Sequence, residues 1–249
     1  MDSKAYKIQD SITNQKKSKL KRYQELVVGT ESLLYLIKYE LIVLFISWIP
    51  GALGIFLRSK LYSIILGKVG SSVVFGTNIV LRHPQKINMG DNVIIDDNVM
   101  IDAKGSGNDG ITLRNDVFIG RNSILSCKDG NIELDERANI GFNCEVFSSN
   151  NVKIGKDNII AAYTYIVGGG NYKLDRTDIP INRQYDFKGK GGVTLGDDVW
   201  IGAHCVILDG VHIDNGTAIT AGAIVTKDVP GLCVAAGIPA KVILNRAKS

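Results

Sequence analysis

The stretch LGDDVWIGAHCVILDGVHIDNGTAITAGAIV, residues 195–225, decides the fold. An aliphatic residue returns at every sixth position of this stretch: Leu195, Ile201, Ile207, Ile213, Ile219 and Val225. A period of six fits neither an α-helix, with its period of about 3.6, nor a simple alternating strand. It is typical of a solenoid in which each hexad forms one short strand and one turn.

The same period extends toward the N-terminus. The earlier members of the aliphatic series are Met89, Ile95, Ile101, Leu113, Ile119, Leu125, Leu134, Ile140, Val146, Ile154, Ile160 and Ile166. Three inserted residues follow Leu125, a shorter slip follows Val146, and a long interruption follows Ile166. The strands of an ordinary sandwich would not keep one phase through so many units.

Two further positions of the hexad support a solenoid. The position two residues before each aliphatic residue is small or β-branched, as in Val199, Cys205 and Thr217. A glycine followed by Asp or Asn often completes the unit, and these residues tolerate the left-handed backbone of tight corners. We therefore predict triangular coils of three hexads whose inward residues stack on those of the neighbouring coils.

The composition excludes several other classes of protein. Hydrophobic residues make up 45% of the 249 residues and charged residues 22%, which is ordinary for a folded domain. The net charge of +4 is mild, and no arginine run interleaved with aromatic residues indicates nucleic-acid binding. The four cysteines form no CxxC pair, and residues 1–30 are polar and lysine-rich, unlike a secretory signal. We expect a cytoplasmic protein with reduced thiols.

The end of the repeat carries a family resemblance. The elements VWIGA (199–203), AGAIVTKDVP (221–230) and AAGIPAKVI (235–243) resemble the coenzyme-binding end of the hexapeptide-repeat acyltransferases, and especially of the bacterial polysaccharide O-acetyltransferases. The resemblance implies a mainly β protein with a left-handed parallel β-helix over residues 71–246. Residues 1–70, with a basic leader and an apolar helical hairpin, form an N-terminal appendage. The resemblance also implies a homotrimer that uses acetyl-CoA as acyl donor and needs no metal.

The resemblance assigns contacts to the coenzyme. Ala203 and Ala221 would offer backbone contacts to the pantetheine arm, in a groove between subunits. Thr226, Lys227 and Lys241 would meet the phosphates, where lysine acts as a point charge. The implied acceptor is a sugar hydroxyl of a surface polysaccharide or of its lipid-linked precursor. An amine of an amino sugar is the alternative acceptor.

The long interruption, residues 168–192, is expected to form a loop over a neighbouring subunit's groove. In the resembling enzymes this loop begins with Asn-His, and the histidine is the general base. The matching pair here is Asn171-Tyr172, and a tyrosine of ordinary pKa is ionised to about one part in a thousand at neutral pH. Three hypotheses stay open: Tyr172 acts as a perturbed base or positions the hydroxyl, Asp175 or Asp178 replaces the histidine, or the protein is a scaffold that binds coenzyme A without efficient turnover.

The remaining polar residues give weaker signals. We expect His204 to line the groove, His212 to face outward, and His83 to precede the regular repeat. The β-helix carbonic anhydrases hold zinc with three histidines, but His204 and His212 lie at different phases of the hexad, which disfavours converging ligands. Asn143 and Glu145 either orient the substrate or are solvated turn residues.

Residues 32–66 are strongly apolar. Pro50 and Gly51 interrupt this segment, which favours a hairpin of two short helices over a single membrane span. Lys38 precedes the uncharged part, and Arg58 and Lys60 follow it, so we expect positive charge on both flanks.

The sequence leaves two roles open for this hairpin. Trp48, Phe56 and the basic leader favour shallow docking on a membrane surface, which would place the protein on the inner face of the cell membrane. The alternative is a helical cap that covers the open end of the β-helix.

Overall fold

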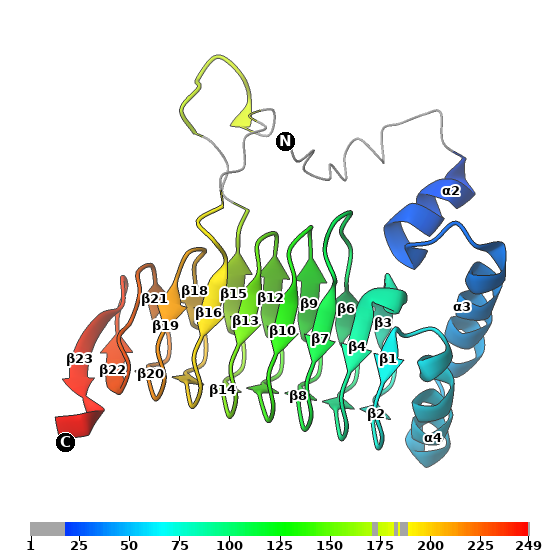
Figure 1. Ribbon diagram of the computed structural model, residues 1–249, viewed down its shortest axis with the longest axis horizontal. Helices are drawn as coiled ribbons and strands as arrows, with labels where there is room; N and C mark the ends of the chain where they lie inside the picture. Colours follow the sequence, from blue (N-terminus) through cyan, green and yellow to red (C-terminus); the bar gives the residue numbers. More distant parts are fainter. Residues whose placement is uncertain (1–17, 171–173, 182–183, 185–188, 249) are drawn as a thin grey trace.

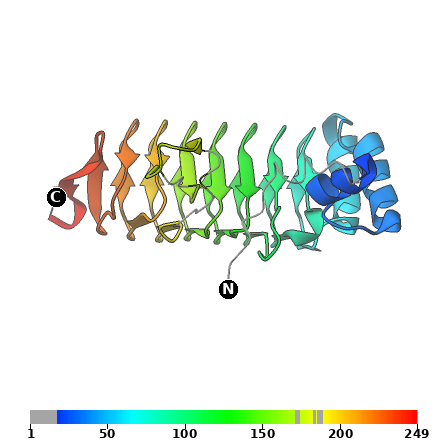
Figure 2. The ribbon, with the colours of Figure 1, turned by 90° about the horizontal axis from the view of Figure 1, so that it is seen from above.

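The computed structural model describes residues 18–170, 174–181, 184 and 189–248 (Figure 1). These residues are mainly β and wind into a parallel β-helix whose coils stack in one row, with helices at the N-terminal end (Figure 2). The architecture is that of the predicted hexapeptide-repeat β-helix.

Three sheets form the sides of the helix. Sheet A contains β1 (Lys68–Val69), β4 (Ile87–Met89), β7 (Ile111–Leu113), β10 (Ile132–Leu134), β13 (Val152–Ile154), β16 (Val193–Leu195) and β19 (His212–Ile213). Sheet B contains β2 (Val74–Phe75), β5 (Ile94–Ile95), β8 (Phe118–Ile119), β11 (Asn139–Ile140), β14 (Ile159–Ile160), β17 (Trp200–Ile201), β20 (Ala218–Ile219), β22 (Cys233–Ala236) and β23 (Lys241–Asn245). Sheet C contains β3 (Val80–Arg82), β6 (Met100–Asp102), β9 (Ile124–Cys127), β12 (Glu145–Ser148), β15 (Tyr165–Gly168), β18 (Val206–Ile207) and β21 (Ile224–Val225).

The predicted aliphatic series forms three stacked columns, one for each sheet. Ile119 pairs with Ile140 in sheet B, and Leu125 pairs with Val146 in sheet C. Every member of the series predicted from Met89 to Val225 is at most 1% exposed. The hexad register is therefore confirmed, and each coil buries its inward residues only against its neighbours.

The three corners of the coil differ in the number of residues that connect their strands. We call them the AB, BC and CA corners, after the two sheets that each one joins. The spacing of the aliphatic series is six residues across every AB and BC corner, and every longer spacing falls at a CA corner. The loop over residues 169–192, which leaves after β15 and returns at β16, is the longest of these excursions (Figure 1).

Short helices cover the first coil. They are α2 (Lys19–Tyr23), the π-helix η1 (Gln24–Val28), α3 (Leu33–Ile46), α4 (Gly51–Leu61) and the 3-10 helix η2 (Tyr62–Ile64). The Tyr39 hydroxyl donates to the Leu81 carbonyl at 2.8 Å, and the Tyr62 and Phe75 rings meet edge to face with centroids 5.1 Å apart. The hairpin of α3 and α4 thus caps the end of the solenoid with one of its faces.

Arg58 corrects one expectation from the sequence. Its side chain is fully buried and donates to the carbonyls of Phe75 and Ile49 at 3.0 and 2.6 Å. The residue fixes α4 to the first coil instead of flanking an apolar segment with exposed charge. None of the helices in the described part of the chain is both long enough and apolar enough to cross a membrane.

The last coil departs from the repeat. After β22 the chain turns back, so that β23 runs antiparallel to β22 and covers the last edge of sheet B. A second 3-10 helix, η3 (Pro84–Lys86), interrupts the CA corner of the first coil, and η5 (Arg246–Lys248) follows β23.

Candidate functional site

Ala203 and Ala221 occupy the same position of the BC corner in successive coils. Each lies two residues after the inward isoleucine of its sheet B strand, Ile201 or Ile219. Neither main-chain N–H meets a hydrogen-bond acceptor among the described residues, although the amides on either side of each are paired. Since stacked strands repeat at about 4.8 Å, the corner presents a row of open amides suited to the carbonyl groups of an extended ligand.

Glycine keeps this row open. A Cβ on Gly202 would lie 2.4 Å from the main-chain nitrogen of Ala221, and one on Gly141 would lie 2.9 Å from that of Ala162. The glycine of the IG element therefore lets the next coil approach and leaves its amide uncovered. Ala162, which the sequence reasoning did not single out, extends the row by one coil.

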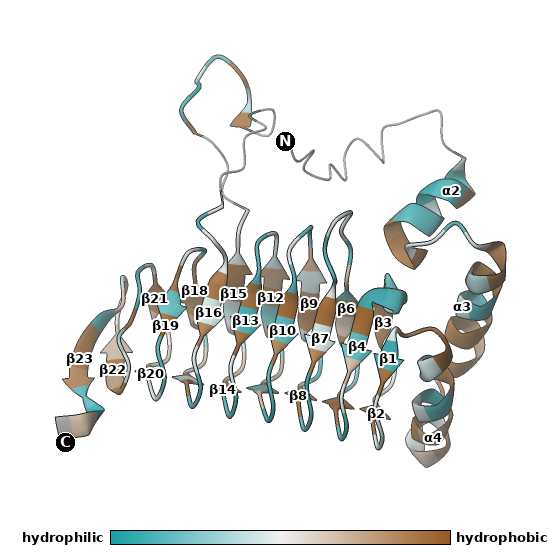
Figure 3. Cartoon of the chain, viewed as in Figure 1, coloured by the Kyte–Doolittle hydropathy of each residue, from teal (hydrophilic) through white to brown (hydrophobic). Residues whose placement is uncertain are grey.

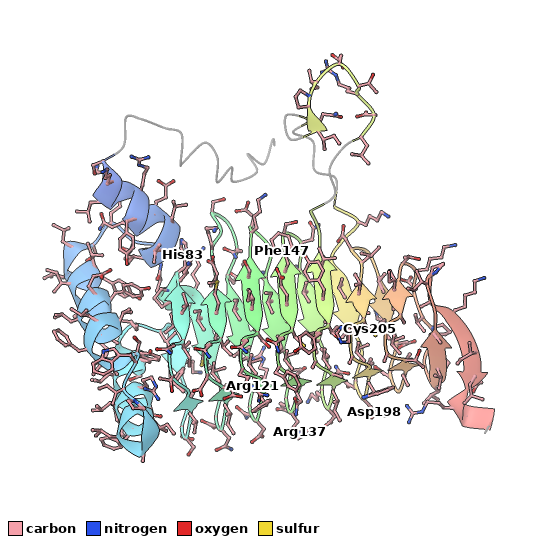
Figure 4. The ribbon with its side chains drawn as sticks, turned by 180° about the vertical axis from the view of Figure 1, so that it is seen from behind. His83, Arg121, Arg137, Phe147, Asp198 and Cys205 are labelled. Carbon is pink, nitrogen blue, oxygen red and sulfur yellow. The ribbon has the colours of Figure 1, made fainter. Side chains whose placement is uncertain are left out.

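Aromatic side chains line the BC corner beside these amides. The rings of Tyr163 and His204 are parallel with centroids 4.9 Å apart, and Phe142 meets Tyr163 edge to face at 5.8 Å. Arg121 lies over the Phe142 ring at 4.7 Å, at the edge of the solenoid away from the long loop (Figure 4). His204 is exposed here, next to Ala203, and its place on a groove wall stays a prediction.

Two members of this row have an unusual backbone. Tyr163 and His204 have φ values of 61° and 59°, at a position where earlier coils carry Asn98, Asn122 and Asn143. A bulky residue pays about 1–3 kcal/mol for the left-handed region, and such residues cluster at functional sites.

The predicted phosphate contacts lie at two corners of one protomer. Lys241 pairs with Ala236 at the end of β22, which brings it to the BC corner near Ala221. Thr226 and Lys227 follow β21 and are exposed at the CA corner. A protomer alone does not gather the five predicted coenzyme contacts into one groove.

The loop supplies part of the predicted catalytic set. Asn171 and Tyr172 lie outside the described residues, and Asp175 is exposed. The Arg176 guanidinium donates to the Asp178 carboxylate at 3.0 Å and holds the pKa of that carboxyl below its ordinary value. An acid held in its charged form by arginine is a weak candidate for a general base.

Asp209 anchors the return of the loop, and the sequence reasoning missed it. Its buried carboxylate accepts hydrogen bonds from the main-chain nitrogens of Lys190 at 2.6 Å and Gly192 at 2.8 Å. The sequence Leu-Asp-Gly at 208–210 predicts a turn, but it does not indicate which loop the aspartate binds.

The remaining histidines lie apart from the amide row. His212 is exposed on β19, as expected. His83 is buried at the first CA corner, where its Nδ1 lies 3.7 Å from Asp102 and its Nε2 lies 3.0 Å from the Glu25 carbonyl oxygen. No group of three or more metal-ligating side chains is assembled within the described ranges.

Asp102 is held as a carboxylate by the groups around it. Burial acts to raise its pKa, but the neighbouring His83 and the charges of Lys104 and Arg82 outweigh burial and leave the pKa below its ordinary value. The cluster ties the first two coils together at the CA corner.

Asn143 and Glu145 belong to the fourth coil. Asn143 lies at the BC corner, and Glu145 is exposed at the start of β12, opposite Tyr165. The neighbouring Cys144 and Cys205 are buried, and burial raises the pKa of both thiols, so neither is a suitable nucleophile.

Comparison with known proteins shows that part of the repeat is similar to transferases. Residues 192–227 match the family model described as bacterial transferase hexapeptide (six repeats). The chain is 37% identical over 116 residues to galactoside O-acetyltransferase of Escherichia coli (strain K12), which covers 45% of this chain and 53% of that protein. It is 59% identical over 51 residues to a 2,3,4,5-tetrahydropyridine-2,6-dicarboxylate N-acetyltransferase of Staphylococcus aureus (strain JH9), over 20% of this chain and 21% of that protein. The chain thus spans about half the length of the first relative, and less of the second.

The fold is also found in a solved structure. The N-acyltransferase AntD from Bacillus cereus, in complex with dTDP-4-amino-4,6-dideoxyglucose and coenzyme A, matches with a TM-score of 0.52 and 22% identity. The match covers 81% of this chain and 91% of AntD.

Proposed function

We propose that this chain is a hexapeptide-repeat acyltransferase and acts as an acetyl-CoA-dependent O-acetyltransferase. In this proposal it transfers acetyl to a sugar hydroxyl of a surface polysaccharide or of its precursor.

The row of open amides at the BC corner carries the proposal. Ala203 and Ala221 lie within the stretch that matches the family model, and Gly202 keeps the second amide accessible. Pantetheine has two amide carbonyls that need donors along an extended chain, and a row of N–H groups supplies them without side-chain rearrangement. Lys241 at the same corner adds a positive charge for a phosphate.

The two-corner arrangement of the phosphate contacts supports a homotrimer. Thr226 and Lys227 lie across sheet C from Ala221, so a groove between two subunits would let one protomer supply the amides and its neighbour the VTKD turn. The loop over residues 169–192 would then reach the neighbour's BC corner with its catalytic residues.

The proposed reaction needs a base. The acceptor oxygen attacks the thioester carbonyl carbon, its proton passes to the base, and the coenzyme thiolate leaves when the tetrahedral intermediate collapses. Backbone N–H groups at the groove would stabilise the oxyanion. With Asp178 held by Arg176, Tyr172 is the preferred candidate for base or hydroxyl-positioning group, supported by Asn171, and Asp175 is the alternative.

We also propose a cytoplasmic location, peripheral on the inner face of the cell membrane, where a lipid-linked glycan would be the acceptor. The apolar helices α3 and α4 support this location, because their outward faces are not covered by the solenoid.

Amino-sugar N-acetylation is the second candidate function. The 51-residue match to an N-acetyltransferase is the observation that favours it. Amino sugars therefore belong in any substrate panel.

Calorimetric titration with acetyl-CoA, combined with thiol release in the presence of hydroxyl and amino sugars, tests the proposal. We expect binding, and release that depends on the acceptor. Tyr172→His should raise the release rate, by as much as about 10²-fold if a positioned base is what the site lacks. Absence of binding would remove the reason to treat the BC corner as a coenzyme site, and binding without release by either protein would favour the scaffold.

A further inference from the structure

Helix α3 has a second apolar face on the side opposite the solenoid. At about 100° per residue, the buried residues Leu36, Tyr39 and Ile42 form one face. The opposite side carries five large apolar residues, and Trp48 follows them in the turn after the helix. All six are at least 52% exposed, and we call them the outer stripe: Leu34, Ile37, Leu41, Leu44, Phe45 and Trp48. A surface helix normally presents polar residues there.

The charged residues of α3 lie at the margins of the outer stripe. Lys38 is exposed on one margin, and Glu40 on the other accepts a hydrogen bond from the Tyr23 hydroxyl at 2.5 Å. Leu53 and Phe56 of α4 continue the apolar surface, at 63% and 60% exposure. The hairpin therefore exposes large apolar side chains from both of its helices at the end of the solenoid, and Figure 3 colours the hydrophobic residues of α3 and α4 brown.

Positive charge is concentrated in the same part of the chain. Residues 1–68 contain eleven Lys and Arg against five Asp and Glu, a net +6, whereas the whole chain has a net charge of +4. The other 181 residues are therefore net negative, at −2. Lys19, Lys21, Lys38 and Lys60 are exposed around the hairpin.

We propose that the outer stripe docks on the surface of a bilayer that contains anionic lipid. An apolar helix face with basic surroundings is the arrangement that binds such surfaces, because the side chains enter the interface while the cations meet the headgroups. A second copy of the chain explains the apolar residues but not the charge, since two copies of a segment with a net charge of +6 repel one another.

In the docked state, the protein contacts the membrane with the N-terminal end of its solenoid. The hairpin covers the first coil (Figure 1), so the coils extend away from the bilayer and the BC corner runs outward from it. This orientation deepens the proposed membrane location. It does not depend on the proposed acyl transfer.

Flotation of the full chain with vesicles tests the proposal. We expect it to float with vesicles of 70% phosphatidylcholine and 30% phosphatidylglycerol, and at least about tenfold less with phosphatidylcholine alone. Ile37→Ser with Leu44→Ser should lower flotation on the anionic vesicles at least about tenfold. The matched control, Ile159→Ser with Ile243→Ser, removes two equally exposed apolar groups from the solenoid and should float like the parent.

Several results would overturn the proposal. They are no flotation of the parent, equal flotation of the stripe variant and the control, and equal flotation on neutral vesicles. A smaller mass of the stripe variant by light scattering, without lipid, would identify the stripe as an interface between copies. Thiol release measured without lipid keeps the transferase proposal separate from all of these outcomes.

Tryptophan fluorescence adds a direct measure of contact. The chain has two tryptophans, Trp48 and Trp200, so a Trp200→Phe variant reports on the stripe alone. We expect a blue shift and quenching by vesicles with brominated acyl chains, and unchanged emission would contradict docking through this face.

Discussion

Replacing Gly202 with alanine tests whether the amide row at the BC corner binds coenzyme A. The new Cβ would lie 2.4 Å from the nitrogen and 2.8 Å from the Cα of Ala221. These are main-chain atoms that cannot rotate away, so one coil must shift relative to the next. Overpacking of this kind costs about 1–3 kcal/mol. At about 2–4 °C per kcal/mol for a chain of this size, we expect the melting temperature to fall by about 2–12 °C.

The substitution should also weaken coenzyme binding. The methyl group covers the Ala221 amide, and one lost hydrogen bond is worth about 0.5–1.5 kcal/mol. With the displacement of the corner added, we expect the affinity for acetyl-CoA to fall at least about tenfold, which is about 1.4 kcal/mol. Calorimetry gives the affinity, and thermal unfolding followed by circular dichroism gives the stability.

Gly155→Ala is the matched control. Its Cβ would lie 2.5 Å from the Gly196 carbonyl oxygen, a similar clash at the AB corner, away from the amide row. It should lower the melting temperature comparably and leave acetyl-CoA affinity unchanged. Full affinity in Gly202→Ala, or an equal loss in both variants, would refute the assignment of the groove to the BC corner.

Three further predictions concern the scaffold. Arg58→Met removes the donor from three main-chain carbonyls and should cost about 3 kcal/mol; limited proteolysis should then cut α3 and α4 first, and unchanged cleavage would contradict the pinning role. The depressed pKa of Asp102 means that its carboxylate stabilises the fold above its unfolded pKa of about 3.9, a contribution lost as the pH falls through the lower folded value. The melting temperature should therefore fall more steeply below pH 4 in the parent than in Asp102→Asn, and parallel curves would refute the linkage. All four cysteines are buried, and burial raises the pKa of the Cys127 thiol to about 12. Ellman's reagent at pH 8 should therefore detect no thiol in the native protein and four after denaturation. Rapid reaction of the native protein would show that the coils open.

The register of the solenoid could be predicted from the sequence because it depends on a local pattern. Whether Ile119 or Ile140 points inward follows from its place in the hexad, and stacking then pairs the two without further information. Ala203 and Ala221 could be placed for the same reason, since a fixed offset from an inward isoleucine puts both at one corner.

Contacts between distant parts of the chain could not be predicted in this way. Arg58 follows an apolar segment in the sequence, and only the position of α4 against β2 shows that its guanidinium meets carbonyls. Asp209 and the loop end at Gly192 become neighbours because the loop returns one coil earlier, a relation that no local pattern contains. The separation of Lys227 from Lys241 likewise depends on the reversal of the chain at β23.

Inserted residues occur only at the CA corner, which affects how the sequence of such a protein can diverge. An insertion there alters neither the spacing of the inward columns nor the pitch of the amides along the BC corner. The AB and BC corners of the described coils carry no such insertion. Segments of different length could therefore be exchanged between relatives at the CA corner without changing the stacked columns of the solenoid.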